Sequence, residues 1–358
     1  MTAGKAVTHF YATESNNRIQ SIVVQPDGKI VAAGKALLEG GFFGLPGLGL
    51  TRYLADGSPD PSFEEDGKVD RHIDLQMADE TRALALQPDA KIVVGGYVDS
   101  ETYESFALVR INADGTLDTT FGEAGTAIAD FGTASILRAL VRQSDGKWIV
   151  AGRVYDAEEY SYRFGLARFL ADGALDPSFG AGGKVTTSFN QSDGAYALLI
   201  QPDGKILVGG DADSETSGGH FNFTLLRYNV DGTLDTTFAQ NGIASTSLGE
   251  YYGHQLRVLL FQGDKILAAG AVSDGYNRDF ALLRYNADGS LDFDFAGDGA
   301  ITTDLGSTND TIYALAWQSA DKVIAAGGTE RTFALARYEM DGKTYRIFLP
   351  VIRQDSKE

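Results

Sequence analysis

Six arginines recur in this sequence, one in each copy of a repeated segment, and an aspartate follows eight residues later in five of the copies. The arginines are Arg52, Arg110, Arg168, Arg227, Arg284 and Arg337, and the aspartates are Asp60, Asp118, Asp176, Asp235 and Asp292. Such arginines could bind an anionic ligand, or each could form a fork with its carboxylate and brace a turn. Because a residue present in every copy usually serves the copy itself, we expect the bracing role.

Four histidines offer the remaining acid–base or metal chemistry, because the chain has no cysteine. His220 and His254 fall in variable segments of neighbouring copies that are expected on the same face, where they could share a metal ion or form an acid–base pair with Asp211 or Asp213. No G-x-S-x-G, H-E-x-x-H or S-x-D-x-G-x-T-W motif occurs. The sequence therefore favours a protein without catalytic activity, and no catalytic residue is assigned.

Three loops of the pattern N-x-D-G-x-L-D place oxygen atoms at spacings that suit calcium, at residues 112–118, 229–235 and 286–292. Two equivalent loops begin with Leu54 and Leu170 instead, and the pattern lacks the third acidic ligand and the terminal glutamate of an EF-hand. Turn formation alone explains the pattern. We therefore expect no cofactor, with Ca²⁺ in these loops as the alternative and the ligands of any metal unassigned.

The elements that must position these residues follow from one phrase, QPDGKI at residues 25–30, which returns with small changes. Its copies begin at Gln25, Gln87, Gln143, Gln201, Gln262 and Gln318, at spacings of 62, 56, 58, 61 and 56 residues. A period this long, built from short runs rich in Val, Ile, Leu, Thr and Tyr, is typical of a propeller or a solenoid. No segment has a sustained helical period, so the chain is predicted to be all-β.

Each copy is predicted to form four antiparallel strands. In residues 183–238 the runs are GKVTTSF, AYALLIQ, KILVGGDA and FTLLRYN, bounded by the turn sequences PDG and VDG. Proline presets the turn, aspartate caps it, and glycine takes the left-handed position that closes it. A glycine pair inside a strand, such as Gly209 and Gly210, is expected where neighbouring sheets pack closely.

The predicted fold is a six-bladed β-propeller of four-stranded antiparallel blades, one domain at residues 1–346 with a C-terminal tail at 347–358. The blades are placed at residues 19–75, 81–131, 137–189, 195–248, 254–305 and 311–343. The sixth copy ends after its third strand, whereas the chain begins with GKAVTHF, a strand of the fourth type. Residues 4–11 are therefore expected to close the ring and leave no free edge, with TYRIFLPVI at 344–352 as the alternative.

The two ends of each predicted sheet differ. The turn end carries the repeated PDG and ADG turns, and the loop end carries loops and crossovers that vary from copy to copy. Function on a repeated scaffold usually resides in such loops. The loop end is rich in tyrosine and carboxylates, which suit a sugar or a basic protein, or else form a solvated rim. The ligand-binding candidates are Tyr155, Asp211, Asp213, His220, Tyr251, Tyr252, His254 and Tyr276.

One loop-end segment, residues 37–47, is too apolar for an ordinary exposed loop. Either it folds over the mouth of the propeller channel, or it is an interface in which Phe42 and Phe43 contact a partner. The sequence does not specify the oligomeric state.

The net charge of −19 argues against binding to nucleic acid or to an anionic membrane surface. No window approaches 18 uninterrupted apolar residues, so no transmembrane segment is expected. The N-terminal residues MTAGKAVTHF lack the apolar centre of a signal peptide. Either the protein is cytoplasmic, or a signal was removed before this chain begins.

The repeat resembles the delta-60 repeat family of bacterial proteins, a β-propeller domain of unknown function. The resemblance rests on QPDGKI, on FTLLRYNVDGTLDTTF at 223–238 and on FGLARFLADGALDPSFGAGGKV at 164–185, and it covers residues 4–343. It implies a propeller and a secreted or surface location, and it brings no catalytic residues. The first copy departs with SPDPSF, and the sixth is truncated after Gly342.

We therefore expect a non-enzymatic, secreted or cell-surface binding module that holds a glycan or a protein at the loop end. The alternative is a polysaccharide lyase or hydrolase with carboxylates near the channel mouth. A third interpretation is an inert spacer within a larger assembly.

Overall fold

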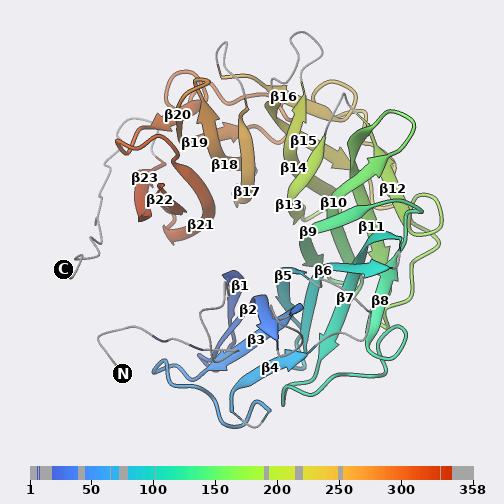
Figure 1. Ribbon diagram of the computed structural model, residues 1–358. Coiled ribbons are helices and arrows are strands. Elements are labelled where there is room, and N and C mark those ends of the chain that lie inside the picture. Colours follow the sequence, from blue (N-terminus) through green and yellow to red (C-terminus); the bar gives the residue numbers. More distant parts are fainter. Residues whose placement is uncertain are drawn as a thin grey trace. The chain divides into compact units, whose positions relative to one another are not determined.

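The computed structural model describes residues 6, 8, 18–38, 45–64, 66–71, 80–100, 102–188, 193–213, 221–248, 253–330 and 332–340. Within these residues the strands form six antiparallel sheets in sequence order, and no helix occurs (Figure 1). The fold is a six-bladed β-propeller of mainly four-stranded sheets, as the repeat predicted. None of the described segments is a helix of the length and apolarity needed to cross a membrane.

The chain divides into two compact units, of which the first is Met1–Thr187 and holds three sheets. The first sheet has the order β1 (Arg18–Val24), β2 (Ile30–Leu38), β3 (Leu45–Tyr53) and β4 (Lys68–Arg71). The second has β5 (Glu80–Leu86), β6 (Ile92–Ser100), β7 (Tyr103–Ile111) and β8 (Thr126–Ala129). The third has β9 (Ser135–Arg142), β10 (Trp148–Asp156), β11 (Ser161–Phe169) and β12 (Lys184–Thr187).

The second unit, Ser188–Glu358, holds the other three sheets. The fourth sheet has β13 (Gly194–Ile200), β14 (Ile206–Asp213), β15 (Phe221–Tyr228) and β16 (Ile243–Thr246). The fifth has β17 (Gln255–Gln262), β18 (Lys265–Ser273), β19 (Arg278–Tyr285) and β20 (Ala300–Thr303). In the described residues the sixth has three strands, β21 (Thr311–Ser319), β22 (Lys322–Gly328) and β23 (Phe333–Glu339).

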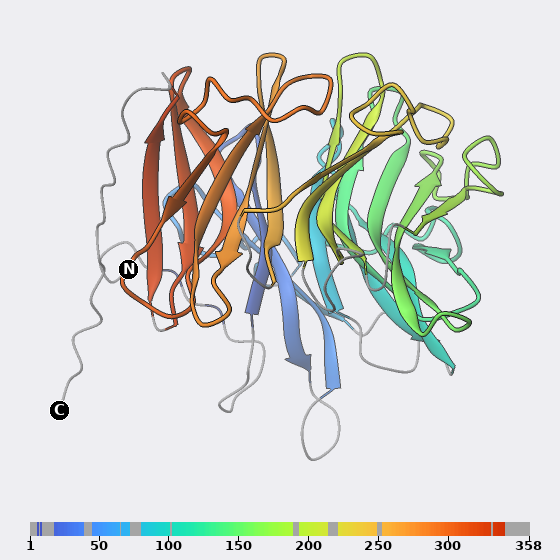
Figure 2. The same cartoon turned by 90° about the horizontal axis from the view of Figure 1, so that it is seen from above.

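Tight turns make each sheet a meander whose strands run between a turn end and a loop end (Figure 2). In the first PDG turn, Gly28 has φ of 85° and its N–H donates to the Gln25 carbonyl at 2.9 Å. A positive φ is the reason for glycine at this position. The second copy has Ala90 there instead, and it takes φ of 64°, so the turn geometry outweighs the steric preference of the side chain.

Within each unit, consecutive sheets pack face to face around separate apolar cores. Phe106, Trp148 and Phe169 are fully buried between the second and third sheets, and Phe223 and Tyr285 between the fourth and fifth. The first glycine of a strand pair serves this packing: a Cβ on Gly209 would lie 2.7 Å from Leu256 of the next sheet. The sequence prediction of close sheet packing is thus confirmed at this position.

The second position of the pair, which is glycine in every copy, is subject to a different constraint. Every first strand has a β-bulge at the same place, which puts one extra residue into the strand. Opposite the bulge the first strand approaches so closely that a Cβ on Gly270 would lie 1.7 Å from the Gln255 carbonyl oxygen. Gly34, Gly152 and Gly327 meet the equivalent carbonyl at 1.9 to 2.1 Å. Only glycine fits there.

A threonine–tyrosine hydroxyl contact recurs between neighbouring strands. Tyr285 donates to Thr246 at 2.9 Å, and Tyr338 donates to Thr303 at 3.1 Å, joining a third strand to the fourth strand of the preceding sheet. Thr8 makes the same contact with Tyr53 of the first sheet. Thr8 therefore contacts β3 in the same way as Thr246, in the fourth strand of one sheet, contacts the third strand of the next sheet.

The predicted closing strand at residues 4–11 otherwise lies outside the described residues, which include only Ala6 and Thr8 of that segment. The alternative strand at 344–352 and the tail at 347–358 also lie outside them. The assignment of a single domain at 1–346 stays a prediction.

Candidate functional site

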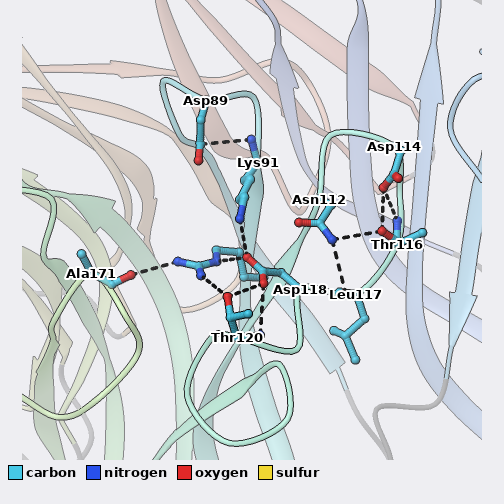
Figure 3. Close-up of polar contacts among 10 residues, drawn as sticks. Asp89, Lys91, Asn112, Asp114, Thr116, Leu117, Asp118, Thr120 and Ala171 are labelled. Atoms are coloured by element: carbon cyan, nitrogen blue, oxygen red, sulfur yellow. Dashed lines mark hydrogen bonds and ion pairs between the residues drawn. The ribbon is translucent and has the colours of Figure 1, made fainter.

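The repeated arginines and aspartates form a fork in each of five sheets, as predicted. In the second sheet, Arg110 Nε donates to Asp118 Oδ2 at 2.7 Å (Figure 3). The other four forks, Arg52–Asp60, Arg168–Asp176, Arg227–Asp235 and Arg284–Asp292, have distances of 2.7 or 2.8 Å. Asp118 Oδ1 also accepts from the Thr120 hydroxyl at 2.6 Å, so both carboxylate oxygens are engaged.

The lysine of the repeated phrase reaches the same carboxylate, a contact that the sequence prediction missed. Lys91 Nζ lies 2.6 Å from Asp118 Oδ2, a contact drawn as a dashed line in Figure 3. Lys29, Lys147, Lys205 and Lys265 make the equivalent contact at 2.8 to 3.3 Å. The signal was present in the sequence, because the lysine directly precedes the first apolar residue of the second strand in every copy.

These contacts determine the pKa of the aspartate in each fork. Burial alone would raise the pKa of Asp118, but hydrogen bonds from Lys91, Thr120 and Arg110 outweigh it and hold the pKa well below its usual range. The same balance lowers the pKa of Asp60, Asp176, Asp235 and Asp292. Each of these carboxylates is therefore charged and paired within the fold at neutral pH.

The guanidinium groups of these arginines also have partners within the fold. Arg110 lies over the Phe121 ring at 4.6 Å, and its Nη1 donates to the Ala171 carbonyl of the next sheet's turn at 2.9 Å. In the calcium-like loop, Asp114 Oδ1 accepts from the amide and hydroxyl of Thr116 at 3.0 and 2.6 Å. The arginine and aspartate side chains of these turns thus bind other groups of the turn end. The hydrogen bonds that form the turn account for the N-x-D-G-x-L-D pattern.

The candidates at the loop end are placed as follows. Tyr155 stacks edge to face on Tyr162, with ring centroids 5.4 Å apart. Asp213 is buried at the end of β14, and Tyr276 is 93% exposed in the loop between β18 and β19. His220, Tyr251, Tyr252, Phe42 and Phe43 lie outside the described residues.

Asp211 and His254 position the backbone of the fifth sheet. Asp211 Oδ1 accepts the backbone N–H of Leu256 in β17 at 2.7 Å. His254 is fully buried, and its two ring nitrogens lie 3.3 Å from the backbone N–H groups of Leu248 and Ser273. A neutral imidazole has one acceptor nitrogen, so it accepts from one of these at a time. Burial gives His254 a place in the packing of the loop end, away from solvent.

The bulged residues of the first strands were not singled out by the sequence prediction. They are Gln20, Arg82, Arg138, Tyr196, Arg257 and Tyr313. Each stands five residues before the glutamine of its phrase, as a long polar or aromatic side chain in an apolar run. That regularity is the signal that could have found them.

In the second unit the bulged residues lie on neighbouring first strands, β13, β17 and β21. The Arg257 guanidinium lies over the Tyr196 ring at 4.2 Å, and Arg257 Nη2 donates to Gln255 Oε1 at 2.6 Å. Tyr313 is 63% exposed. We call Tyr196, Arg257 and Tyr313 the bulge row.

A cluster of three carboxylates lies at the same end of the second unit. Oxygen atoms of Asp279, Asp304 and Asp310 all lie within 4.8 Å of one another. Asp310 is fully buried, and its Oδ2 accepts the Leu305 N–H at 2.9 Å. Burial, and then the charges of Asp304, Asp310 and Asp274, raise the pKa of Asp279. Hard cations favour such oxygen atoms. The cluster lies outside the N-x-D-G-x-L-D loops in which the sequence analysis gave Ca²⁺ as the alternative.

Solved structures with a similar fold include two with TM-scores above 0.5. The propeller of Dos1 matches at a TM-score of 0.53 and 10% identity, over 96% of this chain and 74% of that chain. The polysaccharide lyase Uly1 matches at 0.51 and 11% identity, over 99% and 86%. At these identities the likeness shows the fold alone. No curated protein matches the chain.

One family, described as a domain of unknown function (DUF5122) beta-propeller, matches five segments of the chain. They are residues 25–63, 87–121, 143–179, 201–238 and 262–295, and each begins at the glutamine of the repeated phrase. The repeat and propeller character are confirmed, whereas the delta-60 name stays a resemblance. Because the five segments make up just over half of the sequence, the chain belongs to the DUF5122 family of β-propeller domains.

Proposed function

We propose that this protein is a non-enzymatic, secreted or cell-surface binding module that holds a glycan at its loop end. One observation carries the proposal. The repeated charged side chains at the turn end are paired with one another, whereas tyrosine side chains at the loop end are exposed to solvent. At the turn end, the repeated arginines, lysines and aspartates bind one another. At the loop end of the second unit, Tyr276 and Tyr313 are 93% and 63% exposed. Exposed tyrosines supply contact area at little entropic cost.

A glycan is favoured because the first unit, taken by itself, also has ring faces and hydrogen-bonding groups together at its loop end. Tyr155 and Tyr162 form an aromatic pair with the Arg153 guanidinium 4.3 Å from the Tyr162 centroid. Asp156, at the end of the same strand, accepts two backbone N–H groups of the loop and pairs with Arg163. Rings of this kind pack on the apolar faces of sugars, while carboxylates and guanidinium groups bind hydroxyls.

A glycan array tests the proposal, with wild-type protein compared with a Tyr276→Ala/Tyr313→Ala variant. Phe293→Ala is the matched control, because Phe293 is 67% exposed but lies in a turn-end segment. We expect at least one glycan to bind wild type and the control, and to bind the double variant at least tenfold more weakly. Binding of no glycan, or equal binding by all three proteins, would refute the proposal.

The carboxylate cluster supports a second candidate function, a polysaccharide lyase or hydrolase. Its specific observation is the raised pKa of Asp279, because a carboxyl group that keeps its proton at higher pH suits general acid catalysis. The fold of Uly1, a polysaccharide lyase by name, is similar to this one. Release of reducing ends from a polysaccharide panel, abolished in Asp279→Asn, would favour this candidate; no turnover of any polysaccharide would exclude it in favour of binding.

A further inference from the structure

The bulge is a fixed geometric position whose residue is not fixed. Each first strand bulges at the same place, and glycine stands opposite it in the second strand. Yet the bulged residue is Gln20 in one sheet, Arg82 in another and Tyr196 in a third. The bulge therefore forms with several different side chains. The contacts that repeat in every sheet do not determine which residue stands at this position. Bulges are also places where a strand redirects a side chain, often beside binding sites.

Arg257 differs from the fork arginines in its partners. Arg284 of the same sheet pairs with Asp292 at 2.7 Å, whereas Arg257 has no carboxylate partner among the described residues. Its contacts there are the Gln255 amide oxygen and the Tyr196 ring. In a chain of net charge −19, an arginine with no carboxylate partner among the described residues is a guanidinium with unused donors.

The backbone that carries Arg257 is held from two sides. Asp211 accepts the N–H of Leu256, the residue directly before Arg257, at 2.7 Å. The buried His254 stands three residues before Arg257, and its own N–H donates to the Phe221 carbonyl at 3.1 Å. A guanidinium whose backbone is fixed and whose face rests on an aromatic ring loses little freedom when it binds a ligand.

We propose that the bulge row of the second unit is a subsite for the carboxylate of an acidic glycan, a uronic acid residue. Arg257 binds the carboxylate through two parallel N–H donors, the geometry in which guanidinium and carboxylate fit best. Tyr313, on the neighbouring first strand, offers its exposed ring and hydroxyl to the sugar. The inference rests on the proposed glycan-binding function and names the class of sugar.

The strong negative charge of the chain limits how densely charged this ligand can be. A densely charged polyanion would be repelled by a protein of net charge −19. The subsite therefore fits a glycan with sparse carboxylates, and binding to such a ligand tightens as salt screens the long-range repulsion. This salt response is opposite in sign to that of a basic protein that binds a polyanion.

The test measures binding of hyaluronan oligosaccharides, in which every second sugar carries a carboxylate, and of neutral oligosaccharides that end in a single glucuronate, by titration calorimetry, each beside its neutral methyl ester. We expect at least one acid form to bind wild type at least tenfold more tightly than its ester. Arg257→Gln should lose that preference, and Arg257→Lys should restore only part of it. Lys322→Gln is the control, because it removes the same charge at a turn end. Urea unfolding of each variant checks that it is folded.

The outcomes separate the two proposals. If neutral oligosaccharides bind but the acid forms gain nothing, the carboxylate subsite is wrong and the glycan-binding function stands. If Arg257→Gln keeps the acid preference of wild type while folded, the subsite is also wrong. If no oligosaccharide in this set or on the glycan array binds, the glycan-binding function and the subsite fail together.

Discussion

At the residue scale, the chain uses one carboxylate to hold three parts of each repeat. Asp118 binds Arg110 of the third strand, Lys91 of the turn before the second strand, and Thr120 of its own turn. Removing a partner from such a buried group leaves a charge that the fold has taken out of water and no longer compensates. The cost of a substitution therefore depends on which partner is removed.

Arg110→Met tests this dependence. Arg110 is the more buried cation, with 11% of its side chain exposed against 29% for Lys91. We expect Arg110→Met to lower the free energy of unfolding by about 3 kcal/mol, and Lys91→Met by about 1 kcal/mol. Urea unfolding at pH 7 measures both. Equal losses, or no loss in Arg110→Met, would contradict the role given to the fork.

Asp279→Asn should act in the opposite direction. The pKa of Asp279 is raised in the folded state, so folding favours its protonated form, and its ionisation costs stability as pH rises through that pKa. The variant should have a higher urea midpoint than wild type at pH 7. This gain should vanish below the ordinary carboxyl pKa of about 4. Asp264→Asn, which removes an exposed carboxylate, is the control; an equal gain there would assign the effect to net charge.

At the element scale, the bulge in each first strand links the repeat to the candidate site. It requires glycine in the second strand, and it aims one variable side chain. The two positions are thus limited by different neighbours: Gly209, at the first position, by the side chains of the next sheet, and Gly270, at the second position, by the backbone of its own sheet.

Gly270→Ala and Gly209→Ala separate these reasons. The new Cβ would lie 1.7 Å from the Gln255 carbonyl in the first case, and backbone cannot yield cheaply. In the second it would lie 2.7 Å from the end of the Leu256 side chain, which can rotate. We expect Gly270→Ala to cost about 2 kcal/mol or more and Gly209→Ala clearly less, as measured by thermal unfolding. A larger loss in Gly209→Ala would show that sheet packing dominates at both positions.

The sequence predicted the strands, the turns and the arginine forks, because each of these repeats with the local chemistry that forms it. It did not predict the bulge row, because a bulge depends on how two strands pair. The fixed place of residues such as Arg257 in the apolar run marks the position but does not show that the strand bulges there. The burial of His254 also escaped prediction, since a loop histidine gives no local sign of the backbone groups that surround it. Asp279, Asp304 and Asp310 come from three segments that only the folded sheets bring together.

At the scale of the whole molecule, charge determines how stability responds to acid. Five buried aspartates, one per complete sheet, have pKa values below the ordinary range, and each contributes stability above about pH 4. That contribution is lost as pH falls from the ordinary value through the lowered ones. The stability contributions of the five aspartates add, because each aspartate lies in a different sheet.

We therefore expect the free energy of unfolding to fall steeply below pH 4. Urea unfolding between pH 3 and pH 7 measures this dependence, and Asp118→Asn should reduce its slope by removing one of the five groups. An unchanged free energy between pH 5 and pH 3 would show that these carboxylates do not differ from those of the unfolded chain.

The link from each arginine to the next turn has a consequence for how such a chain can change in length. Arg52, Arg110, Arg227 and Arg284 donate to carbonyls of Ala113, Ala171, Ala287 and Met340 at 2.5 to 3.4 Å. The second and fifth repeats thus each carry both a donor for the next repeat and an acceptor for the preceding one. A duplicated segment of one period would arrive with both halves of this contact already encoded, so copy number can change by gene duplication without any new interaction between sheets. Such an added copy would bring one more bulge, whose residue is free to diverge.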